Sequence, residues 1–282
     1  MINQDLAHIS KTALWVAVYR AREAERPDAA FRDPYARALA GALGEQMARS
    51  SEFSEQNEWS FLGRTWLYDK FIQQEVATGV DLVLNLACGL DTRPYRMTLP
   101  SQLRWVEVDL PELLAYKERI LNAAGAKPVC DLERMPLDLS DLGQRHDMLD
   151  RVTATCRRAL VITEGLLIYL SRQENGVLAD DLTARPCIDR WLIDPCSPGL
   201  LKLMQQSMGQ QVSETPFKFA PEEFLTFWEN KGWQRLAVVS LPEGANEINR
   251  LPDFIKPFLG MPVPDPPGDM VWGGVALLGR KR

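Results

Sequence analysis

The sequence predicts an α/β fold, a doubly wound and mostly parallel sheet of seven strands with helices packed around it. Three observations lead to this prediction. Short apolar runs, such as residues 81–87 and 104–110, are typical of buried strands. Segments with apolar residues at helical spacing, such as 60–78 and 112–125, stand between such runs. Strands that alternate with helices favour right-handed crossovers, and 282 residues suffice for one large domain.

The helices are expected from periodicity and from their end signals. Residues 5–49 have apolar positions at helical spacing, with a break around Pro27. The amphipathic segment 60–78 ends at Gly79, and the segment 112–125 follows a proline suited to a first helical turn. We therefore expect a long helical region ahead of the first strand and a helix after the second.

Seven segments are expected to form the sheet. They are 81–87, 104–110, a short strand near Val129, a strand that begins at 158, and the segments 189–196, 234–241 and 271–280. The proline-rich stretch 260–269 is expected to be a rigid surface loop rather than a linker between domains.

The chain is expected to be one domain, residues 1–282. Residues 1–78 would form an N-terminal helical cap on a core of residues 79–282, with a lid around 198–220. The lid segment carries Leu200, Leu201, Leu203, Met204 and Met208 at helical spacing. It is either an ordinary surface helix or the wall of a pocket, since methionines adapt to irregular apolar ligands.

Composition narrows the class of protein. The net charge of −6 and pI near 5.2 argue against a general nucleic-acid binder, which needs a basic face. The five cysteines form no CxxC pair and only His8 and His146 are available, so neither a metal site nor a disulfide framework is expected. The apolar stretch 13–19 is too short to cross a membrane. We expect a cytoplasmic protein without membrane contact.

The turn after the first strand, "NLACGLDTR", points to a bound ligand. Gly89 allows a close approach to the backbone, but a single glycine does not make the GxGxxG pattern of a dinucleotide site. About 20 residues later the second strand ends in "EVDLP", where Asp109 is placed to accept the hydroxyls of a ribose. Together they indicate a nucleoside-containing cofactor with no phosphate to bind.

Three motifs then identify a family resemblance. The segments "LNLACGLDTRPYR", "WVEVDLPE" and "VITEGLLIYL" resemble the leucine carboxyl methyltransferase superfamily. Its bacterial branch, which includes the tetracenomycin polyketide O-methyltransferase, is similar to this chain over most of residues 15–172. The resemblance implies a class I, Rossmann-like methyltransferase fold and S-adenosyl-L-methionine as cofactor.

The resemblance also implies roles for individual residues. Arg64 would pair with the methionine carboxylate of the cofactor, for which a guanidinium is well suited. Glu164, after the fourth strand, would lie beside the cofactor's ammonium group or the reacting centre, with Tyr169 as a second candidate catalytic residue. The implied cofactor-binding residues are Arg64, Ala87 and Gly89 at the methionine, Asp109 at the ribose, Asp138 and Leu139 at the adenine, together with Leu110 and Glu164.

Simpler readings of the same residues stay open. Arg64 could be a solvated charge, Asp138 could cap the next helix, and Tyr169 could be core packing. Asp91 and Arg93 are expected to pair and shape the turn. Cys88 is expected to be a small filler, since no neighbouring histidine would activate its thiol.

The expected activity is transfer of a methyl group to a carboxylate or phenol of a small molecule, such as a polyketide-like metabolite of secondary metabolism. No histidine is well placed as a general base, which favours a carboxylate or an already acidic phenol. Alternatives are a cofactor-binding regulator without turnover, a protein carboxyl methyltransferase, or a nicotinamide dehydrogenase, which the single-glycine turn disfavours.

Overall fold

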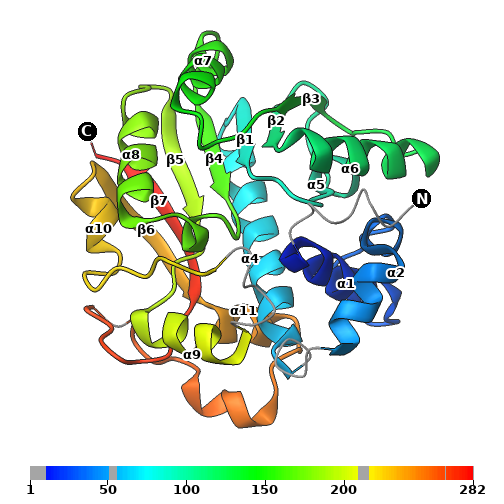
Figure 1. Ribbon diagram of the computed structural model, residues 1–282, viewed down its shortest axis with the longest axis vertical. Coiled ribbons are helices and arrows are strands. Elements are labelled where there is room, and N and C mark those ends of the chain that lie inside the picture. The colour runs from blue at the N-terminus through cyan, green and yellow to red at the C-terminus, as the bar shows by residue number, and fades with distance from the viewer. Residues whose placement is uncertain (1–10, 51–55, 209–215, 264, 282) are drawn as a thin grey trace.

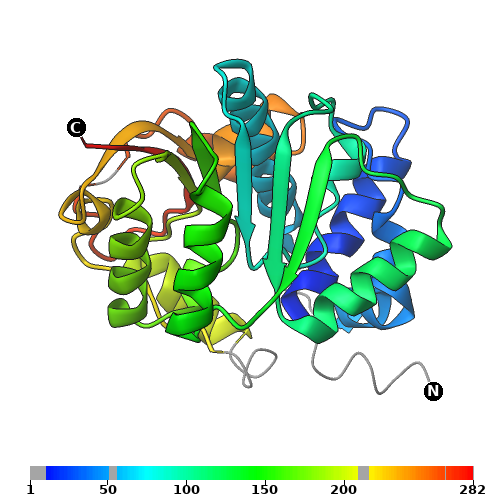
Figure 2. The same ribbon diagram turned by 90° about the horizontal axis from the view of Figure 1, so that it is seen from above.

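Seven strands form one sheet in the order β3-β2-β1-β4-β5-β7-β6. The computed structural model describes residues 11–50, 56–208, 216–263 and 265–281. The pairings from β3 through to β5 are parallel, whereas β7 runs antiparallel to both of its neighbours. Figures 1 and 2 show helices packed around this sheet, so the predicted α/β class with a mostly parallel sheet is confirmed.

The strands have these bounds: β1 Leu82–Leu86, β2 Arg104–Asp109, β3 Asp131–Pro136, β4 Ala159–Thr163, β5 Ile188–Ile193, β6 Trp233–Ser240 and β7 Gly274–Arg280. The helices are α1 Lys11–Glu25, α2 Ala36–Ser50, α4 Glu58–Ala77, α5 Arg93–Arg96, α6 Pro111–Ala123, α7 Leu142–Thr153, α8 Arg172–Thr183, α9 Pro198–Met208, α10 Thr226–Glu229 and α11 Leu241–Glu247. Two 3-10 turns, η1 Leu167–Tyr169 and η2 Asp253–Phe258, complete the elements. None of the described helices has the length and apolar character needed to cross a membrane.

Both faces of the central strands are buried, which explains their continuous apolar sequence. On β1, Leu84 packs into a cluster with Leu149 of α7 and Leu178 of α8, whereas the preceding residue, Val83, packs into a cluster with Tyr68 of α4. Successive side chains of a strand point to opposite faces, so α4 covers one face and α7 and α8 cover the other. Each fully buried Leu or Val contributes about 1.5–3 kcal/mol to stability.

The first two helices pack together beside α6 (Figure 1). Arg20 of α1 donates from Nε to Asp33 Oδ2 at 2.9 Å and from Nη2 to the carbonyl oxygen of Leu90 at 2.6 Å. Asp33 precedes α2, and Leu90 lies in the turn after β1. A buried arginine therefore joins both helices to the turn that sequence analysis singled out.

The third strand lies later in the chain than expected. Val129 precedes β3, which covers Asp131–Pro136 and is mostly exposed or half-buried. β3 is one of the two edge strands of the sheet and is not buried, so it has no continuous apolar run that would reveal its position.

The sequence predicts no disulfide framework, but one pair of cysteines, Cys156 and Cys187, is joined by a disulfide. The two residues are 31 positions apart in sequence, with Cα atoms 6.3 Å apart. Each lies just before one of two neighbouring parallel strands, β4 and β5. Strand pairing brings them together, and their spacing in the sequence gives no sign of it.

Candidate functional site

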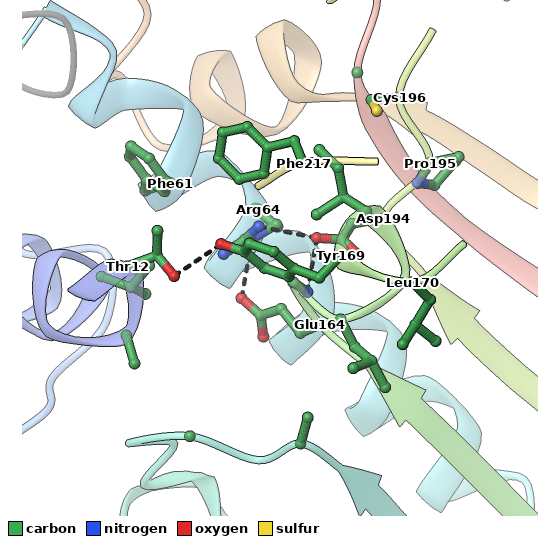
Figure 3. Close-up of a pocket in the computed structure, with 18 of the residues that line it drawn as sticks. Thr12, Phe61, Arg64, Glu164, Tyr169, Leu170, Asp194, Pro195, Cys196 and Phe217 are labelled. Carbon is green, nitrogen blue, oxygen red and sulfur yellow. Dashed lines mark hydrogen bonds and ion pairs between the residues drawn. The ribbon is translucent and has the colours of Figure 1, made fainter. Parts of the chain in front are cut away.

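A cavity of about 1100 Å³ opens at the carboxyl ends of the central strands. The chain passes from β1 to β2 on one side and returns to β4 on the other, which makes the β1–β4 boundary the switch point where α/β folds bind ligands. All nine residues singled out in the sequence line this cavity: Arg64, Ala87, Gly89, Asp109, Leu110, Asp138, Leu139, Glu164 and Tyr169. Figure 3 shows the part of it around Arg64 and Tyr169.

The turn after β1 presents its backbone to the cavity. Ala87 and Gly89 have φ angles of 54° and 51°, in the left-handed region that residues other than glycine rarely adopt. A Cβ atom added to Gly89 would meet the side chain of Ala13 at 3.7 Å. A larger side chain would fill the space between this turn and α1, so glycine keeps that space open.

Asp109 is fixed against the same turn. Its Oδ2 accepts a hydrogen bond from the Gly89 amide at 2.7 Å, and its Oδ1 accepts one from the Leu110 amide at 2.8 Å. Burial raises the pKa of this carboxyl, and the two amide hydrogen bonds oppose that rise. A carboxylate at the end of β2 is thus held in one orientation at the cavity wall.

Arg64 reaches the cavity from α4 between two carboxylates. Its Nε donates to Glu164 Oε1 at 3.1 Å, and its Nη1 donates to Asp194 Oδ2 at 2.9 Å (Figure 3). The Arg64 side chain is only 18% exposed. The alternative reading of Arg64 as a solvated surface charge is therefore wrong.

Glu164 follows β4 and is held by a second arginine. Arg93 Nη1 donates to Glu164 Oε2 at 2.8 Å and to Asp91 Oδ2 at 3.0 Å, while Arg93 Nε donates to Asp69 at 2.6 Å. Asp91 and Arg93 thus form the expected pair. The sequence did not show that Arg93 also connects the turn after β1 to Glu164.

Asp194 is the site residue that sequence analysis missed. It follows β5, and its Oδ2 accepts hydrogen bonds from Arg64 Nη1 and from the amide of Gly165, each at 2.9 Å. Burial raises the pKa of Asp194 to about 6; Arg64 opposes the rise and Glu164 adds to it. The sequence did contain a sign of this residue: "WLIDPC" places an acidic residue after an apolar run, just as "LVITEG" does for Glu164.

The loop after β3 carries Asp138 and Leu139. Asp138 Oδ1 accepts a hydrogen bond from the Ser140 amide at 2.8 Å, which shapes the loop. The N-cap of α7 is Asp141, so the alternative that Asp138 caps the next helix is wrong. The carbonyl oxygen of Leu139 accepts a hydrogen bond from Arg145 Nη1 at 2.8 Å, which ties the loop to α7.

Tyr169 lies on η1 and contributes to both packing and the cavity wall. Its hydroxyl is 2.9 Å from the hydroxyl of Thr12 on α1, and its ring centroid is 5.3 Å from that of Phe217 (Figure 3). Burial raises the pKa of Tyr169, and the hydrogen bond with Thr12 opposes that rise, so the phenol keeps its proton near neutral pH.

A buried ion pair lies behind the turn. Lys117 Nζ is 2.8 Å from Glu107 Oε1 and 3.7 Å from the sulfur of Cys88. Burial raises the pKa of the Cys88 thiol well above its usual range, which fits the expected role as a filler and not as a nucleophile.

The outer part of the cavity is apolar. Its described lining residues there include Leu200, Leu203 and Met204 of α9 and Phe258, Met261 and Val271 near the proline-rich loop. The rest of the expected lid segment, residues 209–215, the side chain of Met208, and His8 lie outside the described residues.

Comparison with known proteins gives a consistent family. A family model described as leucine carboxyl methyltransferase matches residues 13–183. A proposed S-adenosyl-L-methionine-dependent methyltransferase of Parafrankia sp. is 32% identical over 185 residues, which cover 63% of this chain and 59% of that protein. Another, of Frankia alni, is 30% identical over 262 residues, or 86% of this chain and 90% of that protein. The chain thus spans less than two thirds of the Parafrankia relative and most of the Frankia one.

Two solved structures share the architecture. A DUF574 family protein from Streptomyces avermitilis aligns with a TM-score of 0.55 and 13% identity, over 99% of this chain and 100% of that one. A proposed methyltransferase from Thermobifida fusca aligns with a TM-score of 0.54 and 18% identity, over 94% of each chain. Identities this low show the fold alone, and they confirm the predicted Rossmann-like arrangement.

Proposed function

Since the chain belongs to the leucine carboxyl methyltransferase family, we propose that it is an S-adenosyl-L-methionine-dependent methyltransferase acting on a small molecule. The observation that carries this proposal is the convergence of the family's motif residues on one cavity at the switch point of the sheet. The names of the Parafrankia and Frankia relatives support the same activity.

The residues around the cavity fit this cofactor. The Gly89 turn leaves room against an open backbone and offers no series of glycine amides for a pyrophosphate. We assign the ribose hydroxyls to Asp109 and the adenine to Leu110, Asp138 and Leu139. These assignments use carboxylate acceptors and apolar contacts, and both suit a nucleoside without phosphate.

We assign the amino-acid end of the cofactor to the charged groups of the cavity. Arg64 would bind its carboxylate, Glu164 would accept from its ammonium group, and the Ala87–Gly89 turn would contact the methionine chain. When bound, S-adenosyl-L-methionine supplies an electrophilic methyl group. The chain would orient the acceptor and exclude water, which can account for most of the acceleration of such a transfer.

The acceptor is assigned to a carboxylate or phenol oxygen of a small apolar molecule, such as a polyketide-like metabolite. A cavity of about 1100 Å³ is several times the lower end of the range of roughly 300–1,000 Å³ for a single-ligand site, which supports binding of the cofactor together with a small acceptor. The apolar residues of α9 and of the loop near Val271 support an apolar acceptor. We also propose that the chain belongs to the same bacterial branch as the tetracenomycin O-methyltransferase.

The organisation that we propose is one domain with a cap and a lid. Of the range 1–78, the described residues of α1 form a cap, because Thr12, Ala13 and Val16 line the cavity. The helix α4 in that range packs against one face of the sheet and belongs to the core. The described part of the range 198–220 forms the lid, because α9 lines the same cavity. We also propose a cytoplasmic location; a Cys156–Cys187 disulfide that persists in freshly lysed cells would contradict it.

Calorimetric titration of the full chain tests the proposed cofactor. S-adenosylmethionine and S-adenosylhomocysteine should each bind at one site per chain, and NAD should not bind. Binding of NAD, or of none of the three, would overturn the assignment. Binding without methylation of phenols, carboxylic acids or a peptide with a free carboxyl end would favour a regulatory protein instead. Methylation of the peptide alone would favour a protein carboxyl methyltransferase.

A further inference from the structure

Among the described residues that line the cavity, every arginine is already paired with a carboxylate, so none is available to bind the carboxylate of an acceptor. Four arginines line the described part of the cavity. Each is already paired: Arg20 with Asp33, Arg64 with Glu164 and Asp194, Arg93 with Asp69, Asp91 and Glu164, and Arg145 with Asp181. Of these four arginines, Arg64 is also the one that we assign to the carboxylate of the cofactor. An anionic acceptor would therefore meet carboxylates that repel it.

Asp194 lies where these charged groups, at the base of the cavity, meet the acceptor side. Its side chain is 12% exposed, and the hydrogen bonds from Arg64 and Gly165 both end on Oδ2, so neither uses Oδ1. Figure 3 shows Asp194 beside Arg64, where the chain continues to Pro195 and Cys196, and Asp194 also interacts electrostatically with Tyr169. A carboxylate oxygen is thus placed at the boundary between the charged base and the aromatic wall.

Three aromatic rings form that wall. Tyr169 and Phe217 have ring centroids 5.3 Å apart and planes tilted by 42°, and Phe61 lies beside Arg64 with its ring 5.8 Å from the guanidinium carbon. Aromatic side chains pack well against a flat ring through edge and offset contacts. The wall therefore suits an aromatic acceptor better than a flexible aliphatic one.

We propose that Asp194 takes the proton from a neutral, phenol-class hydroxyl acceptor, so that the acceptor is a hydroxyl and not a carboxylate. This inference rests on the proposed methyltransferase function and specifies its acceptor. It supplies a general base, for which the sequence offered no well-placed histidine, and it selects between the carboxylate and phenol left open above.

The proposed step balances in atoms and charge. The acceptor's O–H bond breaks and its proton passes to Asp194 Oδ1, while an electron pair of the oxygen forms the bond to the methyl carbon. The pair of the broken carbon–sulfur bond stays on sulfur, and Asp194 later releases the proton to water. Arg64 and the Gly165 amide hold the carboxylate in place throughout.

The surroundings of Asp194 suit this role. Arg64 and Tyr68 of α4, Glu164 after β4, Tyr169 of η1 and Cys196 after β5 all face it. Burial raises the pKa of Asp194 to about 6, with Arg64 opposing and Glu164 adding to the rise. The group is thus ionised at neutral pH and has a higher affinity for a proton than an exposed aspartate.

A matched pair of probes tests the acceptor group without relying on turnover. 2-Naphthol and 2-naphthoic acid share the same rings and differ in the oxygen group that they present. We would titrate each into the full chain saturated with S-adenosylhomocysteine at pH 7.5. We expect naphthol to bind at least tenfold more tightly than naphthoate. Equal or tighter binding of naphthoate, or no binding of either at millimolar concentration, would overturn the proposal.

Two variants test whether Asp194 causes the preference for naphthol over naphthoate. Asp194→Asn removes the charge but keeps an oxygen that Arg64 and Gly165 can bond, so it should narrow the naphthol preference at least threefold. Asp189→Asn, at the other end of β5, is the control and should leave the preference unchanged. An unchanged preference in a folded Asp194→Asn variant, judged by circular dichroism, would remove Asp194 from the acceptor site.

Methylation of 2-naphthol provides the second readout. The wild-type kcat should rise with pH through about 6, and Asp194→Asn should lower kcat by 100-fold or more and abolish that rise, with KM changing less. A pH profile that is unaltered in the variant would contradict the role of Asp194 as base. If S-adenosylhomocysteine fails to bind the wild-type chain, the proposed function itself fails, so the two failures are distinguishable.

Discussion

Lys117 Nζ lies 2.8 Å from Glu107 Oε1, and neither side chain has exposed surface. Glu107 stands in the middle of β2 and Lys117 on α6, so this pair joins the strand that ends in Asp109 to the helix that follows it. Burial alone would lower the pKa of Lys117, but the neighbouring Cys88, Glu107 and Asp91 raise it to about 12. The lysine is therefore charged inside the protein and depends on its partner.

Replacing Lys117 by methionine should destabilise the fold. The change leaves Glu107 buried with Arg134 as its remaining partner, at 3.0 Å. Breaking one side of a buried pair costs about 3–5 kcal/mol, and the remaining arginine places the expected loss near 3 kcal/mol. Urea unfolding measures it, with the exposed Lys127→Met as control. A loss below 1 kcal/mol would show that Glu107 is not held as the structure has it.

Asp109→Ala should weaken binding of S-adenosylhomocysteine. The variant removes hydrogen bonds to the ribose that involve a charged group, each worth about 1.5–3 kcal/mol, or roughly 10- to 150-fold in affinity. Calorimetric titration measures the change, and Asp147→Ala on the exposed side of α7 serves as control. Unchanged affinity in a folded Asp109→Ala variant would count against the whole cofactor assignment.

Arg64→Lys tests the shape of the cation as well as its charge. Lysine keeps the charge but has no planar group that can donate to two carboxylates at once, so the pairing with Glu164 and Asp194 cannot be reproduced. Affinity for S-adenosylhomocysteine should fall about tenfold while circular dichroism stays unchanged. Arg119→Lys on α6 is the control. Wild-type affinity in Arg64→Ala would mean that α4 does not contribute to the cofactor site.

The cavity could be predicted from sequence because its residues follow buried strands. Gly89, Asp109 and Glu164 each come just after or at the end of an apolar run, and the carboxyl ends of parallel strands meet at one edge of a sheet. Local sequence therefore sufficed to bring these three together.

Contacts made by packing alone could not be predicted in this way. The segment "ELLAYKERIL" matches an ordinary amphipathic helix, so it gives no sign that the charged side chain of Lys117 is buried. The Cys156–Cys187 disulfide follows from the pairing of β4 with β5, and no sequence spacing encodes it. Asp194 was missed for a different reason: its motif was visible, but the resemblance carried no role for it.

Hydrogen exchange should identify α9 as the mobile side of the cavity. Every described side chain of α9 is exposed or half-buried except Gly199, where an added Cβ would clash with the backbone of Asp269 at 2.2 Å. A helix with so little buried surface opens more readily than the sheet. Its amides should exchange faster than those of β4 and slow when S-adenosylhomocysteine and 2-naphthol bind. Slow exchange that ligands leave unaltered would make α9 part of the rigid scaffold.

Asp194 should reduce stability at neutral pH. Its pKa in the folded chain, about 6, lies above the 3.8 of a free aspartate, so between these values the folded state binds more protons than the unfolded state. Its contribution to stability therefore falls as pH rises through that window, and the full cost, about 2–3 kcal/mol, is present above pH 6. Asp194→Asn has no such titration and keeps an oxygen that can accept from Arg64 and Gly165.

The stability of Asp194→Asn relative to wild type should thus increase between pH 4 and pH 7. Urea unfolding at both pH values measures the difference, and Asp147→Asn on α7 gives the background change. If the free energy of unfolding of Asp194→Asn relative to wild type does not increase between pH 4 and pH 7, the carboxylate of Asp194 is as stable inside the protein as in water. A residue with that property has no raised proton affinity to use on an acceptor, so this measurement tests the proposed base without any substrate.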